Sequence, residues 1–452
     1  MALQENLQSS LRLEIERKQR QYGYTLSKLS KLSGINHGHL SDIFRGNRPM
    51  TIGQLDALAV VFGQSPGWLY QLYVDECFTN ERVSRPRVMR YLIRCAEIGE
   101  QSCVEQVVSK LLDNRKNVDI LFSVAEKLFE SGKRKESIPF YQFVVDSEKD
   151  SHSDRFVISQ YRLFRAMQGE NMEENWRAII RFEPYRNRLP ENYQLDGLLH
   201  LANACFMLQE WKKVEKYADE LRSLAMRVYQ EELSKRKNGK ICGPLRTERH
   251  LVVYYGQGFL AKGVALQMQG LYREAKLYVK GYADLGWFEL LDGTGYREVE
   301  KFKIWAKANS YTYDLLMGQT NVLPEYLEFL AKHPEEIPAG LLTIMEAASK
   351  YDILINPVLE QYAEEIERFY NYNDQVNISR QYQFRYHKMI YELKNGFISN
   401  AIEEILYCLD LSDKLRNQQA FKRCTALFWE YRQQATEKQK RIYHEIIGRY
   451  TE

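Results

Sequence analysis

The side chains best suited to molecular recognition are gathered between residues 28 and 48, and their types are those that contact DNA. Amide, imidazole and carboxylate groups bond to base edges in the major groove, whereas lysine and arginine bind phosphates. We therefore expect base contacts from Asn36, His37, Gly38 and Asp42, with His39 on the same face. The residues expected nearer to phosphates are Lys28, Arg45, Asn47 and Arg48.

These residues predict a modest base code assisted by DNA shape. Gly38 has no side chain with which to read a base, and Asp42 is an anion, although a carboxylate can accept a hydrogen bond from cytosine N4. His37 and His39 could instead bind a metal ion, but DNA contact or simple exposure is the favoured interpretation.

The elements that must position these side chains are two short helices joined by a tight turn at Gly34. Thr25 can cap the first helix, and Gly34 supplies the positive φ that ends it. Asn36 can cap the second helix, whose Leu40 and Ile43 are spaced to pack onto the first. This is the frame of a helix-turn-helix, in which the second helix enters the major groove.

Flanking segments supply three further helices. Residues 7–20 form an amphipathic helix with Leu7, Leu11 and Ile15 inward, residues 51–62 form another, and a fifth opens at Ser65. Five helices in this order resemble the phage-repressor type of helix-turn-helix domain. The alternative is an ordinary pair of leucine-patterned helices around a glycine.

Composition favours a soluble globular chain of more than one domain. The chain has 452 residues, is 44% hydrophobic and 27% charged, and carries a net charge of +3. Residues 1–73 hold eight basic and five acidic residues, so the whole positive excess falls on the candidate DNA-binding part. There is no apolar run near the roughly 20 residues that span a bilayer, and no signal peptide, so we expect a cytoplasmic protein without membrane contact.

The sequence contains no recognisable catalytic, cofactor or metal motif. The seven cysteines show no C-x-x-C spacing, and Cys95 and Cys103 are interpreted as buried free thiols. No nucleophile elbow or phosphate loop occurs, and DGTG at 292–295 lacks the strand-to-helix setting of such a loop. We expect no enzyme and no cofactor.

From about residue 86 onward the pattern is helical and self-similar. A glycine or polar turn residue is followed two positions later by a variable residue and five later by a small or apolar one. These turns begin at Gly132, Gln209, Gly270 and Gly396, with looser copies at Gly169, Gly318 and Asp352.

The spacing of these turns scatters about the 34 residues of a tetratricopeptide repeat. The sequence therefore predicts an all-α fold: a helix-turn-helix domain at 1–73, a linker at 74–86, and a tetratricopeptide-like right-handed α-solenoid at 87–452. A generic helical bundle is the alternative. Residues 229–250 break the period and are interpreted as an exposed basic loop, for which DNA contact is a less favoured role.

A helix-turn-helix domain fused to such a solenoid resembles the peptide-pheromone receptors of Gram-positive bacteria, often named from the Rap, Rgg, NprR, PlcR and PrgX members. Three segments look most like the arbitrium receptors of Bacillus phages and their Paenibacillus relatives. They are KGYADLGWFE at 280–289, WAKANSYTYDLLMG at 305–318 and EAASKYDILI at 346–355.

The resemblance implies a cytoplasmic homodimer that binds double-stranded operator DNA and is switched by a short signalling peptide held in the concave groove. It also implies a quorum-sensing role, with phage lysis–lysogeny control as one setting. An adaptor or antiactivator whose solenoid binds a protein partner is the alternative.

An extended peptide requires side-chain amides for its backbone and aromatic groups for its side chains. Asn203 is the leading candidate. The other candidates are Asn309, Tyr161, Arg165, Tyr255, Gln257, Tyr313, Gln383 and Arg385. The alternative for each is a helix-packing or solvent-facing role, because the repeat register is imperfect.

Overall fold

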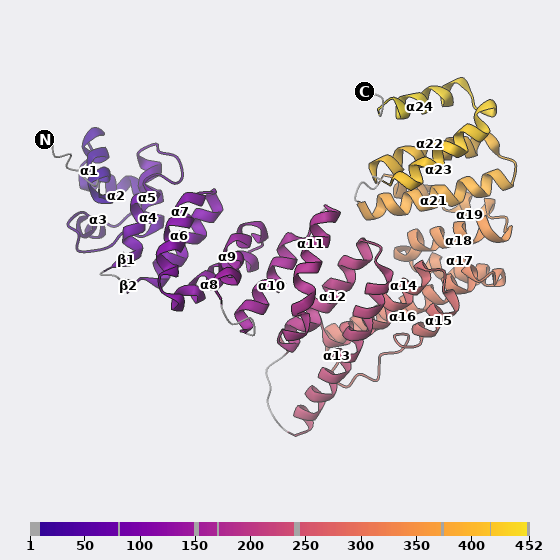
Figure 1. The fold of residues 1–452 in the computed structure, drawn as a ribbon, viewed down its shortest axis with the longest axis horizontal. Helices are drawn as coiled ribbons and strands as arrows, with labels where there is room; N and C mark the ends of the chain where they lie inside the picture. Colours follow the sequence, from indigo (N-terminus) through magenta and orange to yellow (C-terminus); the bar gives the residue numbers. More distant parts are fainter. Residues whose placement is uncertain are drawn as a thin grey trace. The chain divides into compact units, whose positions relative to one another are not determined.

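The computed structural model describes residues 10–79, 82–148, 153–169, 171–238, 245–371, 375–415 and 417–449. Their contacts divide the chain into two compact units, Met1–Ala204 and Cys205–Glu452. Both units are built from consecutive helices, and within the described residues the strands are confined to one short hairpin (Figure 1). The predicted all-α fold, with an N-terminal five-helix domain followed by a helical array, is confirmed.

The five-helix domain contains α1 (Leu11–Gln21), α2 (Leu26–Ser33), α3 (His37–Phe44), α4 (Ile52–Val61) and α5 (Tyr70–Cys77). Leu11 and Ile15 of α1 are buried as predicted, whereas Leu7 lies outside the described residues. Ser10 caps α1 by accepting a hydrogen bond from the Leu13 amide. The fifth helix begins at Tyr70 and not at Ser65, because residues 66–69 form a turn.

Unit 1 continues with an antiparallel hairpin and six further helices up to α11, and α12 crosses its boundary. Strands β1 (Phe78–Thr79) and β2 (Arg82–Val83) form the hairpin. The helices are α6 (Arg85–Ile98), α7 (Gln101–Leu112), α8 (Val118–Glu130), α9 (Arg134–Ser147), α10 (Asp154–Met167), α11 (Met172–Phe182) and α12 (Glu191–Met207).

The described residues of 74–86, predicted as a linker, form the end of α5, the short hairpin and the start of α6. Helix α5 extends to Cys77, and both Val74 and Cys77 are buried. One hydrophobic core runs from Leu11 in α1 to Ala166 in α10 without a break at this segment. The apolar side chains of α5 therefore join the five-helix domain to the helices that follow.

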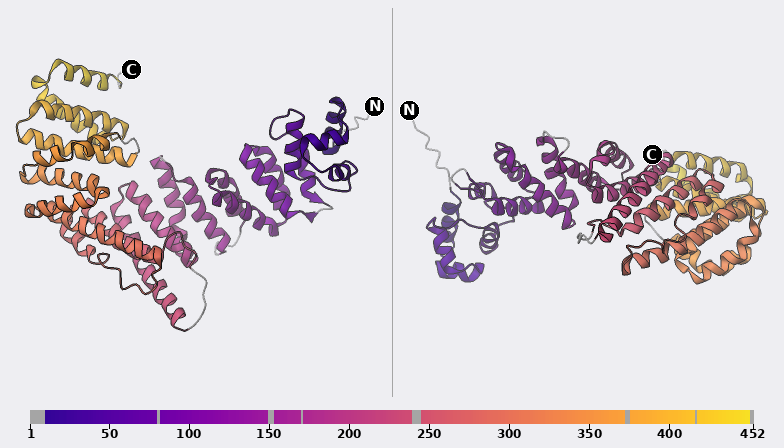
Figure 2. Two further views of the ribbon diagram at one scale, coloured as in Figure 1. Left: turned by 180° about the vertical axis from the view of Figure 1, so that it is seen from behind. Right: turned by 90° about the horizontal axis from the view of Figure 1, so that it is seen from below.

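Unit 2 is a succession of helices that pack on their neighbours (Figure 2). They are α13 (Trp211–Lys237), α14 (Leu251–Met268), α15 (Tyr272–Val279), α16 (Gly293–Leu316), α17 (Leu323–Lys332), α18 (Ile337–Tyr351), α19 (Asn356–Gln361), α20 (Ala363–Tyr370), α21 (Gln375–Lys394), α22 (Ile398–Lys414), α23 (Gln418–Tyr431) and α24 (Glu437–Gly448). The loop predicted at 229–250 is shorter than expected, because α13 remains helical to Lys237. Residues 239–244 of that loop lie outside the described residues.

The predicted repeat turns share one backbone conformation. Residues at six of the seven predicted turns have a left-handed backbone: Gly132 (φ 84°), Gln209 (59°), Gly270 (76°), Gly318 (87°), Asp352 (52°) and Gly396 (78°). Gly169 is not among the positive-φ residues of the described chain. A left-handed residue ends a helix by turning the next amide back onto it.

Hydrogen bonds show this closure directly. The amide of Leu271 bonds to the carbonyl of Leu266 at 3.0 Å, and that of Phe397 bonds to the carbonyl of Glu392 at 2.9 Å. The small or apolar residue five positions after a turn is buried in each strong copy, at Ser137, Val214, Ala275 and Ala401. The repeated pattern thus marks the ends of paired helices, the arrangement of an α-solenoid.

Candidate nucleic-acid interface

The turn between α2 and α3 is closed by short polar side chains. Thr25 Oγ1 accepts a hydrogen bond from the Lys28 amide at 3.2 Å and so caps α2. Gly34 has a φ of 70°, which ends the helix. The Ser30 hydroxyl donates to the Ile35 carbonyl at 2.6 Å and fixes the approach of the chain to α3.

Helix α3 has one buried and one exposed face. Leu40 and Ile43 are buried against the other helices. Asn36 caps the helix, because its Oδ1 accepts hydrogen bonds from the amides of Gly38 at 2.9 Å and His39 at 3.3 Å. That oxygen is therefore occupied, and the Asn36 side-chain NH₂ group is the part left for a base.

The structure brings the predicted base-contact residues together at the start of α3. Asn36, His37, Gly38 and His39 are exposed on its first turn, and Asp42 is half-buried one turn later. Helices in a helix-turn-helix contact base edges with their N-terminal residues, so this turn has the exposure that direct readout requires.

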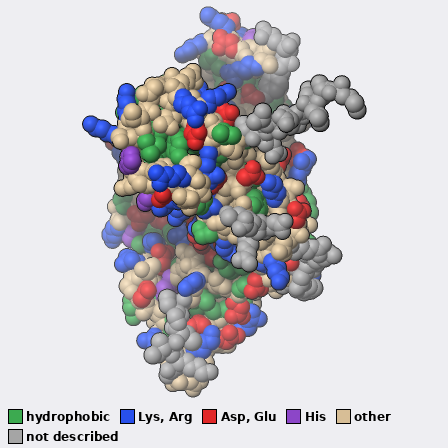
Figure 3. Space-filling model, turned by 90° about the vertical axis from the view of Figure 1, so that its left-hand side faces the viewer, with side chains coloured by type: hydrophobic (Ala, Val, Ile, Leu, Met, Phe, Trp, Pro, Cys, Tyr) green, Lys and Arg blue, Asp and Glu red, His purple; other side chains and the backbone are tan. Residues whose placement is uncertain are grey.

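The predicted phosphate-contact residues lie on α2 and just beyond the C-terminal end of α3. Asn47 and Arg48 both donate their amides to the Asp42 carbonyl, at 2.9 and 3.2 Å, which holds the chain against the end of α3. Arg45, Asn47 and Arg48 are exposed, as is Lys28 on α2. Lys28, Arg45 and Arg48 make no ion pair with any described residue. Figure 3 shows a face of the protein on which lysine and arginine side chains are interspersed with aspartate and glutamate side chains.

Two further features of the helix-turn-helix domain were not predicted. Lys31 of α2 is exposed and adds a cation near Lys28. The N-terminus of α4 carries a capping box, in which Thr51 Oγ1 accepts from the Gln54 amide and Gln54 Oε1 accepts from the Thr51 amide. This cap satisfies an amide of the first turn of α4, and the T-x-x-Q spacing was the available signal.

The five-helix domain is fastened to the array by buried tyrosines. Tyr70, Tyr73 and Tyr91 are each at most 1% exposed, and the rings of Tyr73 and Tyr91 stack with centroids 5.2 Å apart. Tyr91 of α6 donates its hydroxyl to the Tyr70 carbonyl at 2.7 Å. Burial raises the pKa of Tyr91 above its ordinary value, so this hydroxyl stays protonated and remains a donor.

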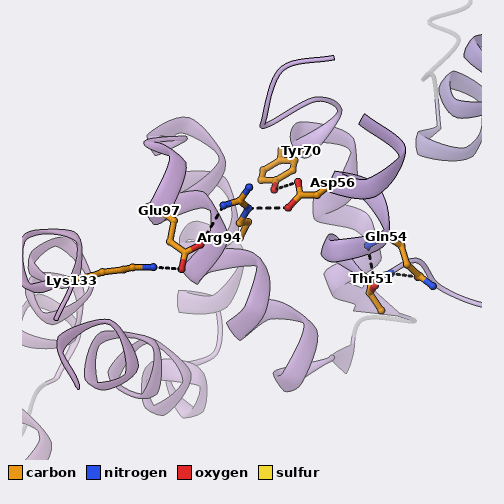
Figure 4. Close-up of polar contacts among 7 residues, drawn as sticks. All are labelled: Thr51, Gln54, Asp56, Tyr70, Arg94, Glu97 and Lys133. Atoms are coloured by element: carbon orange, nitrogen blue, oxygen red, sulfur yellow. Dashed lines mark hydrogen bonds and ion pairs between the residues drawn. The ribbon is translucent and has the colours of Figure 1, made fainter. Parts of the chain in front are cut away.

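A chain of polar contacts lies beside these tyrosines (Figure 4). Tyr70 donates to Asp56 Oδ1 at 2.6 Å, and Arg94 Nε lies 2.9 Å from Asp56 Oδ2. Arg94 also contacts Glu97, which pairs with Lys133 just before α9. The Lys133 ammonium lowers the pKa of Glu97 below its ordinary value. These contacts link α4 of the five-helix domain to α6 and α9.

Two of the nine peptide-site candidates, Tyr161 and Arg165, are packed inside unit 1. Tyr161 and Arg165 of α10 are buried, and Arg165 Nη1 donates to the Tyr161 hydroxyl at 2.9 Å. Because α10 is covered on all sides, both act as packing residues in this conformation. Asn203, the leading candidate, is exposed on α12.

Two candidates in unit 2 are also packing residues. Tyr313 is fully buried. Arg385 is 8% exposed, pairs with Glu404 at 2.8 Å and lies between the rings of Tyr370 and Tyr407. The helical face of each residue was inferred from the imperfect repeat register. The structure shows that both side chains point inward instead of toward a groove.

The other candidates in unit 2 are half-buried. Tyr255 and Gln257 lie on α14, Asn309 on α16 and Gln383 on α21. Asn309 donates its amide to the Tyr282 hydroxyl at 2.8 Å, so this group already has a partner within the protein.

Comparison with known protein families identifies one part of the chain. Residues 13–69 match the family model described as Helix-turn-helix. The chain carries an N-terminal helix-turn-helix domain. The match begins in α1 and stops just before α5, so it contains the whole exposed surface described above. A helix-turn-helix domain indicates a DNA-binding transcription regulator.

No curated protein matches the chain. None of the described helices combines the length and the apolar character that crossing a membrane requires.

Proposed function

We propose that the chain is a cytoplasmic transcription regulator that binds double-stranded operator DNA through its helix-turn-helix domain. The observation that carries the proposal is the exposed first turn of α3. Its Asn36 cap is formed and its apolar side is buried. Lys28, Arg45 and Arg48 are exposed, make no ion pair with a described residue, and are the groups that we propose to meet phosphates. This arrangement supplies both the base-reading and the phosphate-binding groups that recognition needs.

We further propose that the helical array senses a short signalling peptide and that two chains bind one operator as a homodimer. Stacked helix pairs offer extended surfaces for peptides, and helix-turn-helix dimers match half-sites about one helical turn apart. A peptide can switch such a regulator only if it binds two conformations with different affinity. Quorum sensing, including phage lysis–lysogeny control, is the biological setting that we propose for this mechanism.

The test begins with selection of bound sequences from a random duplex library, using the full chain. Fluorescence anisotropy then measures affinity for the selected duplex and for a shuffled duplex of equal length. A regulator prefers the selected duplex at least a thousandfold at physiological salt. Equal affinity for the two duplexes would reject the proposal.

The peptide and dimer proposals need their own measurements. Short peptides encoded beside the gene are added to the DNA complex, and a change in DNA affinity supports a peptide sensor. Sedimentation of the chain on the selected duplex should give two chains per duplex. A stoichiometric protein captured from host lysate, with no peptide effect, would favour the adaptor.

A further inference from the structure

Arg12 connects three parts of the helix-turn-helix domain. Its Nε donates to the carbonyl of Ile43, in the last turn of α3, at 2.9 Å. Its Nη2 lies 2.9 Å from Glu76 Oε1 on α5. A single side chain on α1 therefore holds the C-terminal end of the helix whose opposite end carries the base-contact residues.

Glu76 extends this contact toward the array. Its second carboxylate oxygen accepts a hydrogen bond from the Met50 amide, in the segment that leads to α4, at 3.2 Å. Its backbone carbonyl accepts from Arg87 of α6. The contacts thus run from the recognition helix, α3, through α1 and α5 to the first helix of the array.

The ion pair between Arg12 and Glu76 differs from the exposed ion pairs on α1. The Glu76 side chain is 9% exposed and that of Arg12 is 32% exposed, whereas Arg17, which pairs with Glu14 one turn further along α1, is 72% exposed. Exposed pairs contribute little to stability, but a buried carboxylate with several donors fixes geometry.

The chemistry at this position requires arginine. The planar guanidinium has several donors in a fixed fork, so it can bind a carbonyl and a carboxylate at once. A lysine carries the same charge on one flexible nitrogen and cannot reproduce both contacts. The charge also suits the negative C-terminal end of α3.

We propose that Arg12 and Glu76 are positioning residues for DNA recognition, which hold α3 at the angle that its base contacts need. The inference rests on the proposed DNA-binding function. Base contacts require placement within about half an ångström, whereas phosphate contacts tolerate more movement. Loss of the pair should therefore reduce sequence discrimination more than overall affinity for DNA.

The experiment compares Arg12→Lys with Arg17→Lys in the full chain. Both substitutions keep the charge and lie on the same helix. The selected and shuffled duplexes are titrated with each variant over a range of salt concentrations. We expect Arg12→Lys to lower the ratio of the two affinities about tenfold, the loss typical of a charged hydrogen bond, with an unchanged salt slope. Arg17→Lys should leave both the affinity ratio and the salt slope unchanged.

Glu76→Gln provides a second variant, because its amide oxygen can still accept from Met50 while the charge that binds Arg12 is lost. Glu76→Gln should also lower the ratio of the affinities for the selected and shuffled duplexes. Circular dichroism verifies that each variant is folded before titration.

The outcomes separate this inference from the proposed function. If the wild-type chain shows no preference for any duplex, the proposed function fails. If the wild type discriminates and Arg12→Lys and Glu76→Gln discriminate equally well, the positioning role is wrong. An equal loss on both duplexes, or a flatter salt slope for Arg12→Lys, would also overturn it, because these results indicate a phosphate contact or a smaller active fraction.

Discussion

Replacing Arg48 by alanine tests the assignment of the phosphate contacts. Three of the exposed cations of each chain, Lys28, Arg45 and Arg48, are those assigned to phosphates, and they make no ion pair with a described residue. A homodimer would then make about six phosphate contacts, and its affinity should fall about a thousandfold between 50 and 200 mM salt. Arg48→Ala removes one contact per chain, so the fall should shrink to about a hundredfold.

The assay is fluorescence anisotropy on the selected and shuffled duplexes at four or more salt concentrations. The slope of log affinity against log salt should flatten by about one for each chain bound, and equally on both duplexes. Arg17→Ala is the matched control, because Arg17 is exposed, is paired with Glu14 and is not among the residues proposed to contact DNA. A slope that stays unchanged in Arg48→Ala, or a loss confined to the selected duplex, would refute the reasoning.

Four other changes test further parts of the account. His37→Ala should relax sequence preference by about tenfold while leaving the salt slope intact, as measured by repeating the duplex selection, and an unaltered preference would exclude a base contact. Asn36→Asp keeps the helix cap and adds a negative charge, so the melting temperature should hold while DNA affinity falls; a lower melting temperature would contradict the cap geometry. Asn203→Ala should abolish peptide binding measured by calorimetry and spare DNA binding, and an unchanged peptide Kd would remove Asn203 from the site. Burial raises the pKa of Glu392 from 4.5 to about 7, so the folded chain binds more protons than the unfolded chain between these values. The chain therefore loses up to about 3 kcal/mol of folding stability as pH rises through this window. Glu392→Gln should flatten the resulting fall in melting temperature between pH 5 and 8, and a fall as steep as in the wild type would contradict this.

The sequence predicted the features that depend on local contacts. Gly34 and Asn36 act within four residues of themselves, as turn and cap, so their roles could be inferred from spacing alone. Gln209 was assigned to a repeat turn although most of the other turns have glycine at this position. Its φ of 59° confirms that assignment. Such turns recur because each helix end has the same unpaired carbonyls to satisfy.

Features that join distant segments could not be predicted. Arg12 and Glu76 lie on the first and the last helix of the five-helix domain, and nothing in their spacing marks them as partners. The burial of Val74 and Cys77 in the segment predicted as a linker depends on α6 and α7 packing against α5.

The peptide-site candidates show the same limit. Tyr313 and Asn309 lie four residues apart on α16, yet one is fully buried and the other half-buried. A repeat register that is uncertain by one residue rotates a side chain by about 100° around the helix axis. The face of each candidate could therefore be found only from the packed helices.

The most direct test of the central claim is the affinity ratio between the selected and shuffled duplexes for the unmodified full chain at physiological salt. The exposed first turn of α3 predicts a ratio of at least about a thousand. A ratio near one would contradict the claim that this helix reads DNA.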